Sequence, residues 1–439
     1  MVEGRGGFGY IRGAVYFLYS ILMGAAFLAA LPVYFVKLRL LRGEPVRAAE
    51  RLAIRLPRPK GGRPFLWVHA VSVGEVLSFQ NLLREIRSAH PGWEIGFSTL
   101  TNTGYAVARA NLRDADHVFL VPVDVGWSVR RVFRRLRPAL LVLVESEFWP
   151  RLLREAERRR CPVLSVNGRI SERSFRRFRR YRSLSLPMLK KISRFLVQTP
   201  QDRSRLEDIG IDGGRIEVSG NLKCDIRLPA MPAADLRLLR GELGLPERKK
   251  VVVAGSIHKG EEGFLFGAFR EVRKTRDDIL LVLAPRHPEK FNDLEKDFSD
   301  ELLVLRRRTK LVPGQAWDVL FLDTIGELAR FYALSDAAFI GGSLIPWGGQ
   351  NLLEPAFYGK PVFFGPYMKN FADLADAFVR AGGARIVQTP EEIAEIFLFR
   401  DPDEMARMGR KALATLISLQ GATGKTMTAL GSFMPRSDG

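Results

Sequence analysis

Hydrophobic and polar positions alternate along the chain in two series of short apolar runs, which are separated by amphipathic segments of helical length. The first series covers residues 65–71, 93–99, 117–123, 139–145, 162–168, 194–199 and 215–220. The second series covers residues 250–256, 279–285, 318–324, 336–342 and 361–366. Such runs are typical of strands buried on both faces of a parallel sheet, and their alternation with helices indicates βαβ units. The pattern therefore predicts an α/β protein with two doubly wound, Rossmann-like domains.

Composition between the two series gives the domain boundaries. Residues 228–250 contain LPAMPAAD, whose two prolines indicate a linker. We therefore expect an N-terminal domain over residues 45–227 and a C-terminal domain over residues 251–390. Residues 391–431 begin with one long helical pattern that no strand follows, and these C-terminal helices could pack back on the N-terminal domain. Because ligands bind at the carboxyl ends of doubly wound sheets, we expect the two sheets to face a shared cleft.

One segment near the N-terminus is apolar throughout. Residues 13–36 hold no charged side chain in 24 positions, and a helix needs about 20 apolar residues to cross the hydrocarbon core of a bilayer. A signal peptide has a shorter apolar core of about 7–15 residues. The segment therefore predicts a retained transmembrane helix, with a buried core helix as the alternative. Nine lysines and arginines follow between Lys37 and Arg63, which by the positive-inside rule places the rest of the chain in the cytoplasm.

Charge narrows the class of partner. The formal net charge of +20 favours a polyanion, such as a nucleic acid or an anionic membrane. We expect no nucleic-acid partner, because no recognised nucleic-acid motif accompanies the charge. From Arg169 to Arg194 ten basic residues accompany one acid, Glu172, with apolar side chains between them. Beside a membrane anchor this pattern indicates contact with anionic lipid, although a solvated surface gives the same pattern. Cys161 and Cys224 are far apart, which fits a reducing compartment.

Carboxylates follow two of the predicted strands of the first domain. Ser72 and Glu75 have the S-x-x-E spacing of a capping box, just beyond the carboxyl end of the first strand. Glu145 and Glu147 follow another strand, next to Phe148. Partial burial of this pair would raise a carboxyl pKa and favour a functional role, whereas an exposed loop pair would be the plain alternative.

The second domain offers candidate phosphate-binding residues. Glycines in residues 341–366 precede a helix that is expected to begin near Asn351, where backbone N–H groups could face a phosphate. Glu354 could accept hydrogen bonds from ribose hydroxyls, or it could form a capping box with Asn351. Arg286 follows a predicted strand and suits a phosphate or a carboxylate, although a surface arginine is equally consistent with the pattern. Residues 255–262 form a turn of small residues after the first strand of this domain.

We expect no metal ion and no cofactor. The five histidines and two cysteines lack metal-ligand spacing. Asp114 and Asp116 form a D-x-D, which in some glycosyltransferases holds a divalent metal. This pair precedes a predicted strand, however, so it should point away from the predicted cleft.

Several stretches that contain the residues described above resemble, in order along the chain, sequences of the Kdo transferases. These enzymes attach 3-deoxy-D-manno-octulosonic acid (Kdo) to lipid A precursors at the bacterial inner membrane. The matching stretches are HAVSVGE (69–75), VESEFWP (144–150), NGRISERS (167–174), SGNLKCD (219–225), APRHPEKF (284–291), DTIGELARFY (323–332) and GGQNLLEPAFYGKPVFFGP (348–366). They span most of the chain after the apolar segment. Two stretches differ slightly from the commonest sequence of the family, namely AGSIHKGEE (254–262) and the second leucine of NLLEP (Leu353). Neither difference removes a position to which the family gives a function.

The resemblance implies a GT-B fold, with the acceptor held by the first domain and CMP-Kdo by the second. It makes Glu75 the general base and lets Glu145 and Lys223 assist the transition state. The implied donor-binding residues are Pro285, Arg286, Gly326, Glu327, Leu328, Asn351, Leu352, Leu353 and Glu354. The implied partners are CMP-Kdo, a phosphorylated lipid A precursor and the anionic surface of the inner membrane, to which the chain would be anchored with its catalytic domains in the cytoplasm.

Displacement with inversion fits these roles, because it needs one base within hydrogen-bond reach of the acceptor hydroxyl. CMP carries one phosphate, so basic side chains can neutralise the leaving group without a metal. Three alternatives remain open: a membrane-associated GT-B transferase that uses a UDP-sugar, a sugar-nucleotide epimerase, and a non-catalytic, membrane-tethered sensor of nucleotide sugars.

Overall fold

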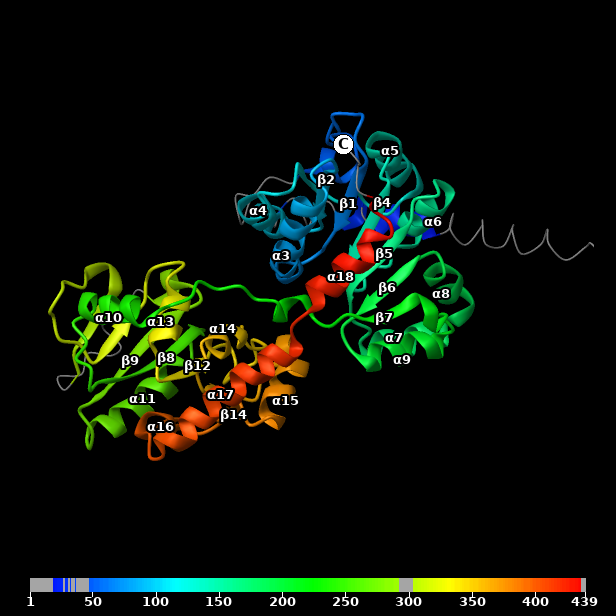
Figure 1. Cartoon of the computed structure of the whole chain (residues 1–439). Helices are drawn as coiled ribbons and strands as arrows, with labels where there is room; N and C mark the ends of the chain where they lie inside the picture. Colours follow the sequence, from blue (N-terminus) through cyan, green and yellow to red (C-terminus); the bar gives the residue numbers. More distant parts are fainter. Residues whose placement is uncertain are drawn as a thin grey trace, which may run out of the picture. The chain divides into compact units, whose positions relative to one another are not determined.

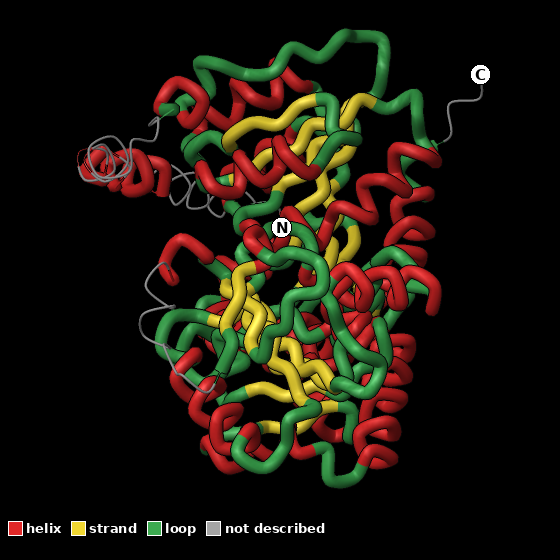
Figure 2. The backbone as a smooth tube through the Cα atoms, turned by 90° about the vertical axis from the view of Figure 1, so that its left-hand side faces the viewer, coloured by secondary structure: helices red, strands yellow, loops and turns green. Residues whose placement is uncertain are grey.

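The computed structural model describes residues 19–26, 28–30, 32, 36, 47–291 and 303–435. The chain forms two compact units (Figure 1). The first unit comprises Met1–Asp225 and Gln420–Gly439, and the second comprises Ile226–Leu419. Strands in each unit are flanked by helices (Figure 2).

The first unit is built on a seven-stranded parallel sheet in the order β3-β2-β1-β4-β5-β6-β7. The strands are β1 Phe65–His69, β2 Glu94–Thr99, β3 His117–Leu120, β4 Leu140–Val144, β5 Val163–Gly168, β6 Arg194–Val197 and β7 Ile216–Val218. The strand order reverses between β1 and β4, which are paired with Leu66 opposite Leu140. Ligands of doubly wound sheets bind at the carboxyl ends of the strands at such a point.

Helices cover both faces of this sheet. They are α2 Ala48–Arg51, α3 Val73–Ala89, α4 Asn102–Asn111, α5 Gly126–Leu136, α6 Pro150–Arg158, α7 Glu172–Arg180, α8 Arg182–Leu189, α9 Pro200–Ile209 and α18 Ala422–Gly431, with the short 3₁₀ helices η2 Gly213–Arg215 and η3 Leu222–Cys224. Successive side chains of a strand point to opposite faces of the sheet. Trp67 of β1 accordingly joins the core around Phe133, while Leu66 joins the core around Phe79. This two-sided burial explains why β1 is apolar at nearly every position.

The second unit repeats the architecture with a parallel sheet in the order β10-β11-β9-β8-β12-β13-β14. Its strands are β8 Lys250–Ile257, β9 Ile279–Pro285, β10 Leu305–Arg307, β11 Val319–Phe321, β12 Ala337–Ile340, β13 Val362–Phe364 and β14 Ala384–Ile386. Its helices are α10 Ala233–Glu242, α11 Glu262–Arg273, α13 Leu328–Leu334, α14 Leu353–Phe357, α15 Ala372–Arg380, α16 Pro390–Leu398 and α17 Pro402–Leu419, with 3₁₀ helices η4 Pro288–Phe291, η5 Arg308–Lys310 and η6 Lys369–Phe371. The order reverses between β8 and β12.

The structure confirms the prediction of two parallel-sheet α/β domains, and each predicted strand is present. Two strands were missed, β10 and β14. Both have three residues, lie at the edges of the second sheet and carry arginine, so neither produces an apolar run. Residues 228–250, expected as a linker, lie in the second unit and include α10.

The single long helix expected at the start of residues 391–431 is wrong in detail. Phe399 adopts a left-handed conformation with φ 45°, and Pro402 begins a new helix, so the segment divides into α16 and α17. Both belong to the second unit, whereas α18 belongs to the first and packs against α3 and η3. Ala422 and Leu430 of α18 are buried in the same core as Phe79.

Of the predicted membrane anchor, residues 13–36, the positions 13–18, 27, 31 and 33–35 lie outside the described residues. Within the part of the chain that is described, no helix combines the length and the apolar character needed to cross a membrane. Residues 19–26 are helical, and Tyr19 donates its hydroxyl to Asp124 Oδ2 at 3.1 Å. This part of the segment therefore contacts the first unit.

Candidate active site

Glu75 lies immediately beyond the carboxyl end of β1, in the first turn of α3. Its backbone N–H donates to Ser72 Oγ at 3.2 Å, and its Oε1 accepts from the backbone N–H of Ser72 at 3.2 Å. This confirms the predicted capping box. Its other oxygen, Oε2, accepts from the N–H of Val71 at 2.7 Å. The side chain is buried, so both carboxylate oxygens are held at the start of the helix.

Glu145 follows β4 directly, across the point of strand reversal from Glu75. It has φ 59°, in the left-handed region that costs a residue with a side chain on the order of 1–3 kcal/mol. Its N–H donates to the carbonyl of Val166 at 2.8 Å, and its carbonyl accepts from Ser165 Oγ at 3.1 Å. The neighbouring strand β5 thus holds the strained backbone in place. Backbone strain of this kind is characteristic of functional sites.

The predicted catalytic groups lie within electrostatic range of one another. Burial raises the pKa of Glu145, the charge of Glu75 raises it further, and the cations Lys223 and Arg169 oppose the rise. Burial also raises the pKa of Glu147, against the hydrogen bond that Trp149 Nε1 donates to it at 2.8 Å. The predicted rise in a carboxyl pKa at this loop is therefore confirmed for both residues.

Two asparagines that sequence reasoning did not assign hold Lys223. Asn221 Oδ1 accepts from the N–H of Lys223 at 3.0 Å and begins η3. Asn167 Oδ1 accepts from the N–H of Leu222 at 3.0 Å. Asn167 is fully buried and has φ 57°, a conformation that asparagine tolerates better than most residues. The sequence offered one signal for their importance, which is that both asparagines lie in stretches that resemble the family.

His69, the last residue of β1, is a second group that the sequence did not single out. It is fully buried, its Nδ1 lies 3.0 Å from Ser98 Oγ, and its ring meets Trp149 edge to face with centroids 5.0 Å apart. Burial lowers the pKa of His69 to about 4, so the ring is neutral at pH 7. Among the described residues its Nε2 has no hydrogen-bond partner.

In the second unit the structure brings two predicted donor-binding residues, Arg286 and Glu354, into electrostatic range. Arg286 follows Pro285 at the end of β9, and its N–H donates to the carbonyl of Ile257 at 2.9 Å. Glu354 in α14 accepts from Asn351 Nδ2 at 3.1 Å. Burial raises the pKa of Glu354, whereas the bond from Asn351 and the charge of Arg286 oppose the rise.

The other predicted donor-binding residues occupy structural positions. Gly326 has φ 93° in the turn before α13, and Glu327 precedes Leu328 at the start of that helix. Partial burial would raise the pKa of Glu327, but hydrogen bonds from Thr324 and Arg308 outweigh it and lower the pKa. The side chains of Leu352 and Leu353 are buried. Any contact of these segments with a ligand would therefore involve mainly their backbone.

The glycine-rich turn after β12 differs from the expectation. The N–H groups of residues 342–344 donate to the carboxylate of Glu261 at 2.6, 2.8 and 2.9 Å, and the N–H of His258 donates to it at 2.9 Å. A Cβ on Gly341 would lie 2.4 Å from Ile257 Cα, so this close approach requires glycine. The amides of residues 342–344, at the beginning of this stretch, are thus bound to a fully buried internal carboxylate and are not available to a phosphate.

A metal site is not apparent in the described ranges. They contain no group of three or more histidine, cysteine, aspartate or glutamate side chains that could hold an ion. Within the D-x-D pair, Asp116 accepts from the N–H of Ile95 at 2.7 Å and forms an ion pair with Arg87 at 2.5 Å. The carboxylate of Asp116 is thus part of the packing before β3.

Comparisons with known proteins agree with the motifs. A family model described as 3-deoxy-D-manno-octulosonic-acid transferase (kdotransferase) matches residues 46–226. A 3-deoxy-D-manno-octulosonic acid transferase of Bordetella pertussis is 31% identical over 400 residues, which are 88% of this chain and 90% of that protein. A bifunctional glycosyltransferase/methyltransferase of Fusobacterium nucleatum subsp. nucleatum is 32% identical over 336 residues. That match covers 75% of this chain but 52% of the relative, so the chain spans about half of its length.

One solved structure supports the fold. A crystal structure described as a putative UDP-N-acetylglucosamine 2-epimerase from Listeria monocytogenes superposes with a TM-score of 0.55. The match covers 84% of this chain and 96% of the other, with 13% sequence identity. This similarity supports a GT-B-like fold with two parallel-sheet α/β domains and says nothing about the reaction.

Proposed function

The chain belongs to the 3-deoxy-D-manno-octulosonic acid transferases and is a glycosyltransferase, and on this premise we propose that it moves Kdo from CMP-Kdo to the lipid A precursor lipid IVA, with inversion. The observation that carries the proposal is the cluster at the carboxyl edge of the first sheet. There Glu75 and Lys223 both lie near enough to Glu145 to shift its pKa. Such a cluster at the point of strand reversal is where a doubly wound domain performs its chemistry.

We assign Glu75 as the general base. It takes the proton of the acceptor hydroxyl, the freed oxygen attacks the anomeric carbon of Kdo, and the bond to the CMP phosphate breaks. An ionised carboxylate offers about four lone-pair positions for hydrogen bonds. Those of Glu75 accept two backbone N–H groups, from Val71 and Ser72. The remaining positions can receive the proton while the helix start stays fixed.

Three further groups stabilise the charges that develop during transfer. Oxocarbenium character on the sugar is stabilised by the carboxylate of Glu145, and negative charge on the departing phosphate is neutralised by Lys223 and Arg286. The strained backbone of Glu145 and the asparagine contacts around η3 support these roles, because preorganised charges do not have to reorient during the reaction.

The second unit binds the donor in this proposal. Arg286 contacts the phosphate of CMP, and Glu354, positioned by Asn351, accepts hydrogen bonds from the ribose. The other predicted positions, Pro285, Gly326, Glu327, Leu328, Leu352 and Leu353, contribute backbone groups and shape. Since CMP has a single phosphate, the side chains of Lys223 and Arg286 suffice to neutralise its charge without a metal.

The proposal also places the chain at the inner membrane. Residues 13–36 would anchor it, with both units on the cytoplasmic side and the basic segment Arg169–Arg194 near anionic lipid. Tyr181 and Leu184 in that segment are more than half exposed, which supports contact with a surface that is both charged and apolar.

The decisive experiment incubates the purified chain with CMP-Kdo and the tetraacylated lipid A precursor in detergent containing EDTA, and products are weighed by mass spectrometry. We expect a mass gain of at least one Kdo, inhibited by CMP and unaffected by equal UDP. Inhibition by UDP, or absence of Kdo transfer in the folded protein, would overturn the assigned donor. Activity that returns only when a divalent metal is restored would overturn the metal-free mechanism.

A further inference from the structure

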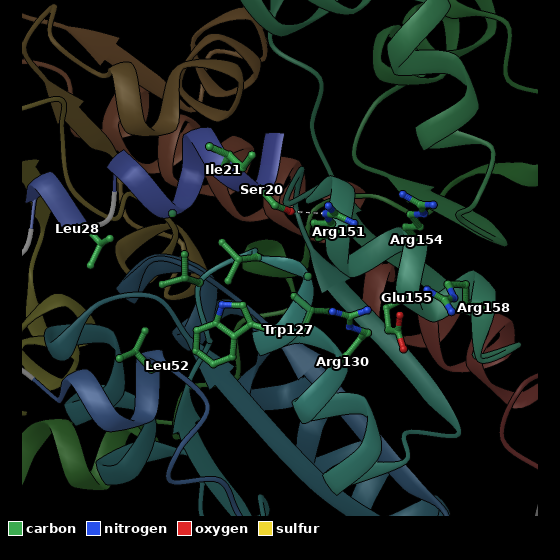
Figure 3. Close-up of a pocket in the computed structure, with 15 residues that line it drawn as sticks. Ser20, Ile21, Leu28, Leu52, Trp127, Arg130, Arg151, Arg154, Glu155 and Arg158 are labelled. Carbon is green, nitrogen blue, oxygen red and sulfur yellow. Dashed lines mark hydrogen bonds between the residues drawn. The ribbon is translucent and has the colours of Figure 1, made fainter. Parts of the chain in front are cut away.

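The first unit contains a pocket of about 580 Å³ bounded by the helical residues 19–26 and 28–30, called here the N-terminal helix, and by α5 and α6 (Figure 3). Figure 3 shows Leu28 and Leu52 on one side of the view and Arg151, Arg154 and Arg158 on the other, with Trp127 between them. The pocket is chemically divided, because one part of its lining is basic and the other is apolar.

The basic part is made of four arginines. Arg151, Arg154 and Arg158 share one face of α6, since residues three and four apart are neighbours on a helix, and Arg130 comes from α5. Among the described lining residues the only carboxylate is Glu155, which forms an ion pair with Arg159 at 3.0 Å. Like charges at this spacing repel. An anion bound on this face would therefore relieve repulsion as well as form new ion pairs.

The apolar part of the lining is open to solvent. Leu28 is 65% exposed, Ile21 51% and Trp127 48%, and all three line the pocket. Large apolar side chains exposed together at a pocket indicate a binding surface, and tryptophan is enriched at the boundary between membrane and water. Inorganic phosphate would use the arginines and leave this part uncovered. The pairing of both parts fits an amphiphile.

The buried carboxylate of Asp124 accepts hydrogen bonds both from the N-terminal helix and from the start of α6. Asp124 Oδ2 accepts from the hydroxyl of Tyr19 at 3.1 Å and from the N–H of Arg151 at 3.0 Å, and its Oδ1 accepts from the N–H of Leu152 at 2.9 Å. Arg151 also donates its Nε to Ser20 Oγ. These contacts fix the N-terminal helix against the start of α6, so the pocket is formed before a ligand arrives.

We propose that this pocket binds an anionic membrane phospholipid, with its headgroup phosphate on the arginines and an acyl chain along the apolar wall. The planar guanidinium groups of arginine match phosphate oxygens in pairs. None of the assigned catalytic residues, Glu75, Glu145 and Lys223, lines the pocket. The pocket is therefore separate from the catalytic cluster, and this inference goes beyond the proposed function.

The test uses the full chain purified in a mild detergent, with no donor and no acceptor added. Dioleoylphosphatidylglycerol is titrated while native mass spectrometry counts retained lipid and the melting temperature is followed. The double variant Arg154→Gln/Arg158→Gln removes two charges from the pocket. Its matched control, Arg173→Gln/Arg180→Gln, removes two charges from α7, in the basic segment that the sequence assigned to the membrane surface.

We expect the parent and the α7 control to retain one phospholipid per chain. The pocket variant should bind it roughly 30-fold more weakly, about fivefold for each arginine near an anionic lipid. Equal loss in both variants would mean general charge attraction and would overturn the site. So would unchanged binding by the pocket variant, or equal stabilisation of the parent by inorganic phosphate. Because neither substrate is present, failure of Kdo transfer would leave this result intact.

Discussion

The two units place a glutamate at corresponding positions and use it differently. Glu75 lies in the first turn of α3, the helix that follows β1, and Glu261 lies at the N-cap of α11, the helix that follows β8. Each glutamate is therefore at the start of the helix that comes after the first strand of its sheet. Both carboxylates are buried, and both accept hydrogen bonds from the backbone of the turn around them. Fold position alone would not separate them.

Glu75 and Glu261 differ in how many of their lone-pair positions remain free to accept a further hydrogen bond. Glu261 accepts four N–H groups, which fill the roughly four lone-pair positions of a carboxylate. Glu75 accepts two. Glu261 therefore joins two loops of the second unit and has no capacity left for a proton from a substrate, whereas Glu75 retains half of its capacity. The comparison indicates that an unfilled position on a fixed carboxylate distinguishes a candidate base from a structural residue.

Removing the charge of Glu75 should produce the largest effect. We expect Glu75→Gln to fold and bind CMP as the parent does, yet to lose Kdo transfer by about 10²–10⁴-fold, the usual contribution of a general base. Single-turnover transfer and CMP calorimetry measure the two properties separately. Glu85→Gln, on the same helix, should keep parental activity. A Glu75→Gln enzyme with near-parental turnover would reduce Glu75 to a helix cap and remove the contrast with Glu261.

Glu261→Gln should affect stability first. The amide can accept from two of the four N–H groups, and its NH₂ then faces the other two. Each buried donor left without a partner costs about 1–3 kcal/mol, so the second unit should lose about 2–6 kcal/mol. Hydrogen exchange resolved by unit measures this loss. Glu262→Gln is the control, because Glu262 lies at the surface and accepts from Gly260 N–H at 2.6 Å. Equal effects of the two substitutions would contradict the structural role of Glu261.

Acid should destabilise the first unit through His69. Burial lowers its pKa from 6.5 to about 4, so between these values the unfolded chain binds a proton that the folded chain does not. The stabilisation is complete above pH 6.5 and is lost as the pH falls toward 4, by about 3 kcal/mol in total. Exchange of the β1 amides at pH 7 and pH 4.5 measures it.

The substitution His69→Asn should remove most of that pH dependence, while His287→Asn should not, because His287 in the second unit has a side chain that is 47% exposed. If the β1 amides of the His69→Asn variant lose protection at low pH as strongly as those of the parent, another group is responsible for the acid response.

How much the sequence could predict differs between the units for physical reasons. Strands buried on both faces produce apolar runs, so β1 and β8 were found with nearly their observed bounds, whereas the three-residue edge strands β10 and β14 produce none. The capping box of Ser72 and Glu75 was found because such a box has fixed spacing, whereas the catalytic role of Glu75 was implied by the family resemblance alone. The occupation of the glycine turn by Glu261 could not be predicted, because it joins residues about 80 positions apart. The buried Asn167 escaped for the same reason, since its partner Leu222 is distant in sequence.

The smallest expected effect is a shift in the pH dependence of kcat, which tests the electrostatic influence of Lys223 on Glu145 in the first unit. Lys223 lowers the pKa of Glu145 against burial and the charge of Glu75, which raise it. Lys223→Met should therefore raise the pKa of Glu145, and the acid limb of the profile of kcat against pH should move to higher pH. The substitution also lowers kcat itself, so the quantity to compare between the proteins is the pH at the midpoint of the acid limb. Lys190→Met removes an exposed charge from the same unit, and solvent and salt screening should leave its midpoint unchanged. If the midpoint is the same in all three proteins, Glu145 is not the group whose ionisation the reaction requires, and the cluster in the first unit would act through Glu75 alone.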